Sequence, residues 1–425
     1  MGKRRLPPRF GWVITAFTLA LIFVAIALFI LITDPGSRGE LPPTAPPAPP
    51  SSQALTPSPP ATPIPRDATI LEGDDRSPQL KYLTEDWATD WTRRTIATHE
   101  LRSGGPPRDG IPSIDAPQFI SPEEAADWLG AREPVIALEV NGVARAYPLQ
   151  ILIWHEIVND VIGDVPVAVT FCPLCNAAVV FDRRYQGRVF EFGVSGLLRN
   201  SDLIMYDRQT ESLWQQFTGE GIVGEMAGAQ LTWLPASIIS FEDFVTAHPD
   251  GAILSRETGY NRAYGRNPYV GYDTVDQTPF LFDGPTDERL PPMARVVTLS
   301  LNGEDAAYPY DILAEKRVVM DNVGGQDIVI FYQPGAVSAL DAGVIAASKE
   351  VGATGVFDPN LNGQTLTFVW KEDAFVDQQT GSRWNILGAA TAGPLSGQRL
   401  APLLHADHFW FSWAAFKPDT RIYAE

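Results

Sequence analysis

Alternation of apolar and polar residues predicts β-hairpins at two places far apart in the chain. Residues 135–140 and 143–147 alternate on either side of an Asn-Gly pair, and residues 296–313 repeat this pattern around a second Asn-Gly pair. Asn-Gly between two alternating runs is the sequence signature of a tight type I′ turn. The sequence therefore predicts one hairpin in each place.

The two hairpins belong to an internal duplication. Residues 135–152 return as residues 296–313, and the spacing between the copies then stays constant over the next strand. A repeat of this length indicates a duplicated domain rather than a solenoid. Two further matching pairs are residues 165–173 with 326–334, and DRQTESLW at 207–214 with DQQTGSRW at 377–384.

The patterns predict an α+β fold that is predominantly β, with two related lobes from the duplication behind one transmembrane helix. About 350 residues outside the N-terminal region are enough for two hydrophobic cores. The predicted segments are a cytoplasmic tail (1–12), a transmembrane helix (13–32), a Pro-rich stalk (33–66), a first lobe with the CPLC motif (67–257), a Tyr/Gly-rich linker (258–294) and a second, diverged lobe (295–425).

An uninterrupted apolar run at residues 13–32 carries no charge, and a helix of this length can cross about 30 Å of hydrocarbon. Basic residues before the run favour a cytoplasmic N-terminus. A cleaved signal peptide is the alternative, but the run is longer than a usual signal core and no A-x-A site follows. We therefore expect a single-pass protein of the cell membrane, partnered with the bilayer through this helix, with the bulk of the chain extracytoplasmic.

Charge excludes one class of partner. The chain has 51 acidic and 32 basic residues, a net charge of −19, and no basic stripe after residue 32. Such a surface repels phosphate backbones, so nucleic acid is not an expected partner. A small ligand or a protein partner is compatible with this charge, but no motif identifies either.

The candidate chemistry begins with Cys172 and Cys175, the two cysteines of the chain, which form a CPLC motif between two β-like runs. A thioredoxin-type motif needs a helix that begins at its second cysteine, whereas AAVVF, which follows here, favours a strand. The motif therefore predicts a hairpin turn that directs both sulfurs toward one point. Bound metal, a disulfide and free thiols all remain open.

His155 is the nearest further metal-ligand candidate, seventeen positions before the first cysteine. Two thiolates and one imidazole would suit copper or zinc and would leave one coordination position open. Glu156 and Asp160 are expected as second-shell groups that orient the imidazole. An ordinary buried histidine is the alternative.

The duplication favours a site in the first copy. His155, Cys172 and Cys175 correspond to Lys316, Gln333 and Ala336 in the second copy. Residues that only build the fold should occur in both copies, whereas the residues of a single site should occur in one.

Polar residues are dense around residues 196–219 and could line a pocket, although turn capping and surface ion pairs explain such residues better, because these residue types favour turns. No HExxH motif and no nucleophile elbow is present, so the sequence identifies no catalytic residue. The candidate pocket residues are Arg183, Ser195, Arg199, Asn200, Asp207 and Trp214.

Several motifs in a fixed order resemble the family called domain of unknown function 3179. They include EPVIALEVNGVARAYPLQILIWHEIVND, VAVTFCPLCNAAVVFDR and ETGYNRAYGRNPYVGY, within residues 104–272. The resemblance implies a prokaryotic, commonly exported protein and supplies no activity. The family's usual CPLCG motif has Asn176 here in place of glycine.

These observations lead to two hypotheses. The first is a metal-binding or thiol-redox protein that uses Cys172, Cys175 and His155. The alternative is a non-catalytic ligand-binding or scaffold module with a structural disulfide at the CPLC motif and a ligand cleft between its lobes.

Overall fold

Both Asn-Gly pairs close β-hairpins in the computed structural model, which describes residues 69–424. Strands β5 (Pro134–Val140) and β6 (Val143–Pro148) pair around Asn141 and Gly142, and both turn residues have positive φ. The second copy repeats the register in β19 (Arg295–Leu301) and β20 (Glu304–Pro309). The prediction of two type I′ hairpins is confirmed.

The duplication continues in three dimensions with the same order of elements in each copy. After the hairpin come a one-helix connection and a second antiparallel pair. In the first copy these are α4 (Leu149–His155), β7 (Ile157–Ile162) and β8 (Val165–Cys172); in the second they are α6 (Tyr310–Lys316), β21 (Val318–Val323) and β22 (Gln326–Gln333).

Three sheets contain the strands of the first copy and of the chain before it, in the orders β17-β5-β6-β18-β4, β16-β9-β8-β7 and β1-β2-β15-β14-β13-β12-β3. Their remaining strands are β1 (Leu71–Glu72), β2 (Arg93–Arg94), β3 (Arg102–Ser103), β4 (Phe119–Ile120), β9 (Ala177–Asp182), β12 (Phe192–Arg199), β13 (Asp202–Asp207), β14 (Leu213–Gln215), β15 (Gly221–Val223), β16 (Thr232–Leu234), β17 (Ala236–Ser240) and β18 (Ala252–Leu254), beside a small hairpin of β10 (Arg184–Tyr185) and β11 (Arg188–Val189).

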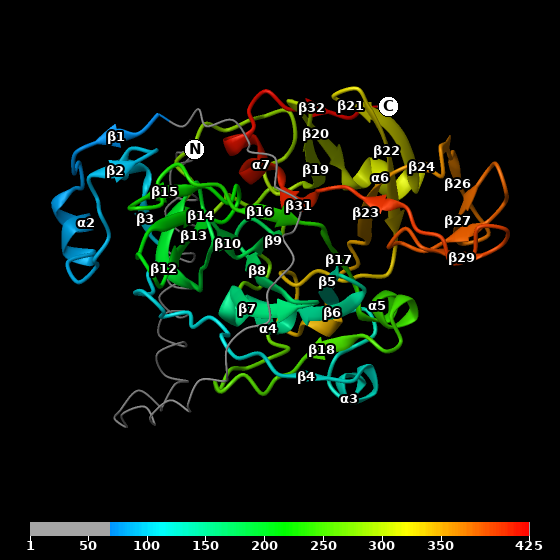
Figure 1. Cartoon of the computed structure of the whole chain (residues 1–425), viewed down its shortest axis with the longest axis horizontal. Helices are drawn as coiled ribbons and strands as arrows, with labels where there is room; N and C mark the ends of the chain where they lie inside the picture. The colour runs from blue at the N-terminus through cyan, green and yellow to red at the C-terminus, as the bar shows by residue number, and fades with distance from the viewer. Residues whose placement is uncertain (1–68, 425) are drawn as a thin grey trace, which may run out of the picture. The chain divides into compact units, whose positions relative to one another are not determined.

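The second copy forms three corresponding sheets, in the orders β31-β19-β20-β32, β21-β22-β23-β30 and β26-β27-β28-β29 (Figure 1). Their remaining strands are β23 (Ala353–Asp358), β26 (Phe368–Lys371), β27 (Ala374–Asp377), β28 (Arg383–Trp384), β29 (Ala390–Ala392), β30 (Ala401–Pro402), β31 (Ala406–Phe409) and β32 (Arg421–Ile422), beside a hairpin of β24 (Asn360–Leu361) and β25 (Gln364–Thr365).

Helices are short throughout the described residues. Besides α4 and α6, they are α2 (Pro78–Leu83), α3 (Pro122–Ala126), α5 (Phe241–Ala247) and α7 (Trp410–Phe416), with 3₁₀ turns at Thr98–Glu100 and Ile345–Ala347. Helices α5 and α7 end the two copies at matching places, each directly after an edge strand.

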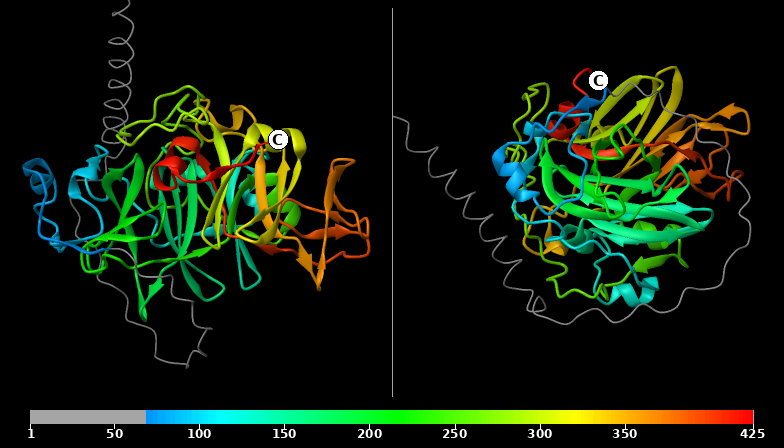
Figure 2. Two further views of the ribbon diagram at one scale, coloured as in Figure 1. Left: turned by 90° about the horizontal axis from the view of Figure 1, so that it is seen from above. Right: turned by 60° about the vertical axis from the view of Figure 1, so that its left-hand side comes forward.

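The predicted fold class, α+β with two lobes, is wrong. The structure is mainly β, and its sheets have a propeller-like arrangement (Figure 2). Edge strand β17 of the first copy packs beside β23 of the second, and β31 packs beside β9. One hydrophobic cluster accordingly contains Val135 and Phe244 together with Phe331 and Phe375. The two copies share a core because the edge strand of each copy packs against a strand of the other. They therefore do not form separate lobes.

The membrane assignment also needs correction. None of the helices in residues 69–424 is long and apolar enough to cross a bilayer. The predicted helix at residues 13–32 lies outside the described residues. The single-pass anchor, the membrane partner and the cell-membrane location are therefore not supported, and we withdraw them.

A repeated polar turn shows which polar residues build the fold. Asp207 receives hydrogen bonds from Thr210 and, at 2.8 Å, from the indole N–H of buried Trp214. Asp377 receives the same bonds from Thr380 and Trp384 in the second copy. A network present in both copies holds a turn and is not specific to one site.

We expect Asp207→Ala and Asp377→Ala to destabilise the protein to a similar extent. Each change leaves a buried indole N–H without its acceptor, which costs about 1–3 kcal/mol. Urea unfolding of the two variants measures this cost. A loss confined to Asp207→Ala would contradict the structural role assigned to both turns.

Candidate metal centre

The CPLC motif forms the turn between β8 and β9, as the sequence predicts. Asn176 has a φ of 51° and its N–H donates to the carbonyl of Pro173, which closes the turn. Cys172 and Cys175 are both buried and both are free thiols. The N–H of Phe409, on β31 of the second copy, donates to the carbonyl of Cys175 at 2.9 Å. The second copy therefore contacts the turn directly.

Asp202 completes a group of three ligand residues. One ligand atom from each of Cys172, Cys175 and Asp202 lies within 4.8 Å of the others, and all three side chains are buried. We call these three residues the Cys-Cys-Asp group. Among the described residues it is the one cluster of His, Cys, Asp or Glu with this spacing.

The two carboxylate oxygens of Asp202 have different surroundings. Its Oδ2 accepts hydrogen bonds from Gln215 Nε2 at 2.5 Å and from the N–H of Phe217 at 3.0 Å. Its Oδ1 is buried and receives no hydrogen bond from an N–H or O–H group of the described residues, so the two neighbouring thiols are the only groups there that can donate to it. A buried polar atom that lacks such a donor is costly and calls for an explanation, and a bound ion would supply one.

Glu156 places a second carboxylate near this group. It follows α4 directly, with a left-handed φ of 59° at the helix end. Burial and the nearby Asp202 raise the pKa of Glu156 to about 8. Burial also raises the pKa of Asp202 to about 7.

Both thiols are shifted in the same direction. Burial raises the pKa of Cys172, and it raises the pKa of Cys175 well above the ordinary value. Reactive redox thiols have a lowered pKa, so this environment does not activate a nucleophile. Among ionisable groups, the ones that shift the pKa values of these two thiols and two carboxylates most are the other members of the same set. All four groups are acids.

The structure does not bring His155 into the group. Its Nδ1 hydrogen-bonds with the carbonyl of Pro112 at 2.7 Å and its Nε2 with the hydroxyl of Tyr264 at 2.6 Å. Both ring nitrogens of His155 are therefore engaged away from the two thiols.

Asp160 belongs to a different network, so it does not orient the imidazole of His155. The hydroxyl of Tyr147 donates to its carboxylate at 2.6 Å, and Arg145 pairs with the same oxygen. Arg183, an expected pocket residue, donates to the carbonyl of Asp160 at 3.0 Å and to that of Phe190 at 2.9 Å.

The other expected pocket residues support strands and turns. The hydroxyl of Ser195 donates to a carbonyl of the neighbouring strand β13. Arg199 pairs with Glu100 at 2.7 Å, and Asn200 has a φ of 51° in the turn from β12 to β13. Asp207 and Trp214 form the repeated turn described above. None of these residues lines the cavity described below.

Asp202 is the member of the Cys-Cys-Asp group that sequence reasoning missed. The hairpin β12–β13 carries it to the thiols, whereas the matching hairpin β26–β27 already turns at Glu372 and Asp373. Asp377 matches Asp207 of the first copy. Five positions before each of them, the second copy has exposed Glu372 and the first copy has Asp202. This difference in hairpin length was the signal available in the sequence.

In the second copy, three of the four positions have non-acidic residues, and the fourth has an exposed acid, Glu372. Where the first copy has Glu156, Cys172, Cys175 and Asp202, the second has Arg317, Gln333, Ala336 and Glu372. The acidic cluster is therefore a property of the first copy alone.

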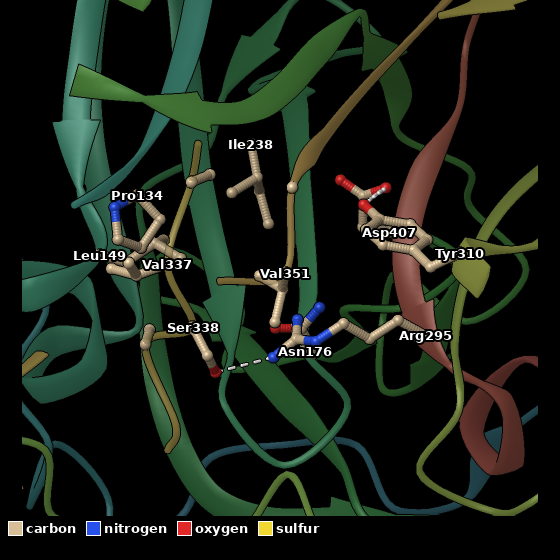
Figure 3. A pocket seen from close by; sticks show the side chains of 13 residues that line it. Pro134, Leu149, Asn176, Ile238, Arg295, Tyr310, Val337, Ser338, Val351 and Asp407 are labelled. Carbon is tan, nitrogen blue, oxygen red and sulfur yellow. Dashed lines mark hydrogen bonds between the residues drawn. The ribbon is translucent and has the colours of Figure 1, made fainter. Parts of the chain in front are cut away.

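A small cavity between the copies lies beside the CPLC turn, because Asn176 lines it (Figure 3). Pro134, Leu149 and Ile238 line it from the first copy, and the equivalent positions of the second copy are polar: Arg295, Tyr310 and Asp407. The hydroxyl of Tyr310 donates to Asp407 at 2.6 Å, and Arg295 donates to Ser338 at 2.8 Å. The cavity has room for about one water, so these residues form an internal polar network and leave no room for a larger ligand.

Fold and site together define a β-rich, internally duplicated protein with one buried acidic cluster. A family model described as "Protein of unknown function (DUF3179)" matches residues 108–420, so the chain belongs to this family. The match extends through the second copy, beyond the motifs in residues 104–272. No curated protein and no solved structure gives a significant match.

Proposed function

We propose that the protein is a metal-binding protein that holds one zinc ion in the Cys-Cys-Asp group. The observation that carries this proposal is the buried Oδ1 of Asp202, which receives no hydrogen bond from an N–H or O–H group and whose carboxylate lies with both thiols inside a 4.8 Å group. A cation would partner this oxygen and would favour the deprotonated forms of all three ligands.

The donor set favours zinc over copper. Zinc binds thiolate sulfur and carboxylate oxygen together in tetrahedral sites. Copper(I) selects soft sulfur ligands, and the carboxylate of Asp202 is a hard oxygen donor. With the imidazole of His155 engaged elsewhere, the case for copper loses its nitrogen ligand.

The ion would have a structural role. The three ligands come from the β8–β9 turn and from the start of β13, which are far apart in the sequence. The ligands are almost completely buried, with exposed fractions of 2 %, 0 % and 0 % for Cys172, Cys175 and Asp202. An ion in this position cross-links two sheets and is shielded from solvent.

The alternative hypothesis is a disulfide between Cys172 and Cys175. Both cysteines are free in the structure. A disulfide would satisfy the sulfurs but would leave the Oδ1 of Asp202 without a partner. The unpaired carboxylate therefore favours metal over the bridge.

Asp202→Asn is expected to lower zinc affinity at least about 100-fold, because the loss of a direct ligand exceeds the 10–100-fold cost of second-shell changes. Glu372→Gln, at the matching exposed position of the second copy, is the control and should bind like the wild type. Metal analysis of the purified full chain gives stoichiometry, and competition with a zinc-binding dye gives affinity. A wild-type chain that binds no zinc and contains an oxidised cysteine pair would refute the proposal.

A further inference from the structure

Gln215 is the side chain that holds the carboxylate of Asp202 in place. Its Nε2 donates to the Oδ2 of Asp202 at 2.5 Å, and both side chains are completely buried. The N–H of Phe217 donates to the same oxygen at 3.0 Å. Both donors therefore bind Oδ2 and leave Oδ1 available to an ion.

Arg199 determines which end of the Gln215 amide faces Asp202. The nitrogen and oxygen ends of an amide have nearly the same size, so its hydrogen-bond partners decide the orientation. The Nη1 of Arg199 donates to the Oε1 of Gln215 at 3.4 Å, and a guanidinium has donors and no acceptor. The oxygen end must therefore face Arg199, which turns the nitrogen end toward Asp202.

The guanidinium of Arg199 is itself held by two further contacts. Its Nε and Nη2 pair with the carboxylate of Glu100 at 2.8 Å and 2.7 Å. Its central carbon lies 5.4 Å from the ring centre of Phe416, and this ring stacks on that of Phe217. An ion pair and an aromatic contact thus fix the group that orients Gln215. A partly exposed ion pair is in this way connected to a fully buried carboxylate.

This arrangement belongs to the first copy. Asn385 occupies the position of Gln215 in the second copy, and its Oδ1 accepts hydrogen bonds from two backbone N–H groups of its own turn. Strand β12 extends to Arg199, whereas the matching strand β26 already ends at Lys371. Both residues therefore differ in the copy that lacks the two thiols, which favours a role connected with the Cys-Cys-Asp group.

We propose that Arg199 and Gln215 are positioning residues that control the zinc affinity of the Cys-Cys-Asp group. This inference rests on the proposed zinc site. Arg199 fixes the amide of Gln215, and the amide fixes Oδ2, so that Asp202 binds the ion through Oδ1. Without Arg199 the amide can turn its oxygen toward Oδ2, which places two acceptors face to face. The carboxylate then loses a donor and its fixed orientation, and metal ligands depend on such outer partners.

A double-mutant cycle tests this role. Arg199→Ala and Gln215→Ala are each expected to lower zinc affinity about 10–100-fold. The double variant should lose little more than Gln215→Ala alone, because Arg199 acts through Gln215. Competition with a zinc-binding dye on the purified full chain measures all four affinities. Because the orientation of Asp202 changes, the visible spectrum of the cobalt(II)-loaded chain should also change in both single variants.

Two control variants remove similar groups elsewhere. Asn385→Ala changes the position of Gln215 in the second copy, and Arg102→Ala removes an ion pair with Asp283 on the adjacent strand β3. Both should bind zinc like the wild type. Thermal unfolding of metal-free Arg199→Ala should resemble that of the metal-free wild type, because a partly exposed ion pair contributes little to stability.

The outcomes separate the positioning role from the zinc site itself. Wild-type affinity in either single variant, or losses that multiply in the double variant, would overturn the positioning role and leave the zinc site in place. A wild-type chain that binds neither zinc nor cobalt would overturn the zinc site and the positioning role with it. Metal-free Arg199→Ala that is much less stable than the metal-free wild type would also count against positioning, because loss of structure would then explain the loss of affinity.

Discussion

Cys172→Ser is expected to abolish stoichiometric zinc in the purified protein. A serine hydroxyl is far harder to deprotonate than a thiol and is not one of the ligands that hold structural zinc. The remaining donors, Cys175 and Asp202, cannot complete a tetrahedral site. Metal analysis should give about one zinc per wild-type chain, as a single zinc site requires, and essentially none per variant chain.

Gln333→Ser is the control for this prediction. Gln333 occupies the position of Cys172 in the second copy and donates a hydrogen bond to Asp243. Its loss affects a local contact, so zinc content should be unchanged. Retention of stoichiometric zinc by Cys172→Ser, or its loss in Gln333→Ser, would show that the ion binds elsewhere.

Local features of the fold could be predicted from the sequence, because short-range interactions determine them. Asn141 and Gly142 specify the hairpin turn through their tolerance of positive φ. Cys172 and Cys175 lie in a turn between strands because AAVVF favours a strand. The internal duplication likewise appears as matching elements in the two copies.

The arrangement of the sheets could not be predicted in this way. Contacts of β17 with β23 and of β31 with β9 join strands more than 100 residues apart. Their side chains would show the same apolar pattern in separate lobes as in one shared core. Phe331 illustrates this: it stacks on Phe375 at 4.2 Å and belongs to a cluster that also contains Phe244.

The candidate site was predicted in part for a similar reason. The two cysteines are close in sequence and were identified, but Asp202 reaches them from another sheet. His155 bonds to Pro112 instead, and the residue after it, Glu156, has a left-handed φ. Nothing in the local sequence revealed this conformation, because glutamate does not usually occupy this region of φ.

Zinc is expected to stabilise the folded protein in a concentration-dependent way. The ligands come together only on folding, so the ion binds the folded chain and has little affinity for the unfolded one. At free zinc 100-fold above the dissociation constant, the added stability is about 2.7 kcal/mol. For a chain of this size, that corresponds to a rise in Tm of about 3–4 °C.

Calorimetry of the full chain stripped with a chelator and then titrated with zinc measures this rise. Cys172→Ser should show no rise at any zinc concentration, which separates the site from weak surface binding. The informative quantity is the slope of Tm against the logarithm of free zinc. An ion that binds only the folded chain must raise Tm steadily with this logarithm above the dissociation constant. Equal melting temperatures with and without zinc in the wild-type chain would exclude the ion as a cross-link between the β8–β9 turn and β13.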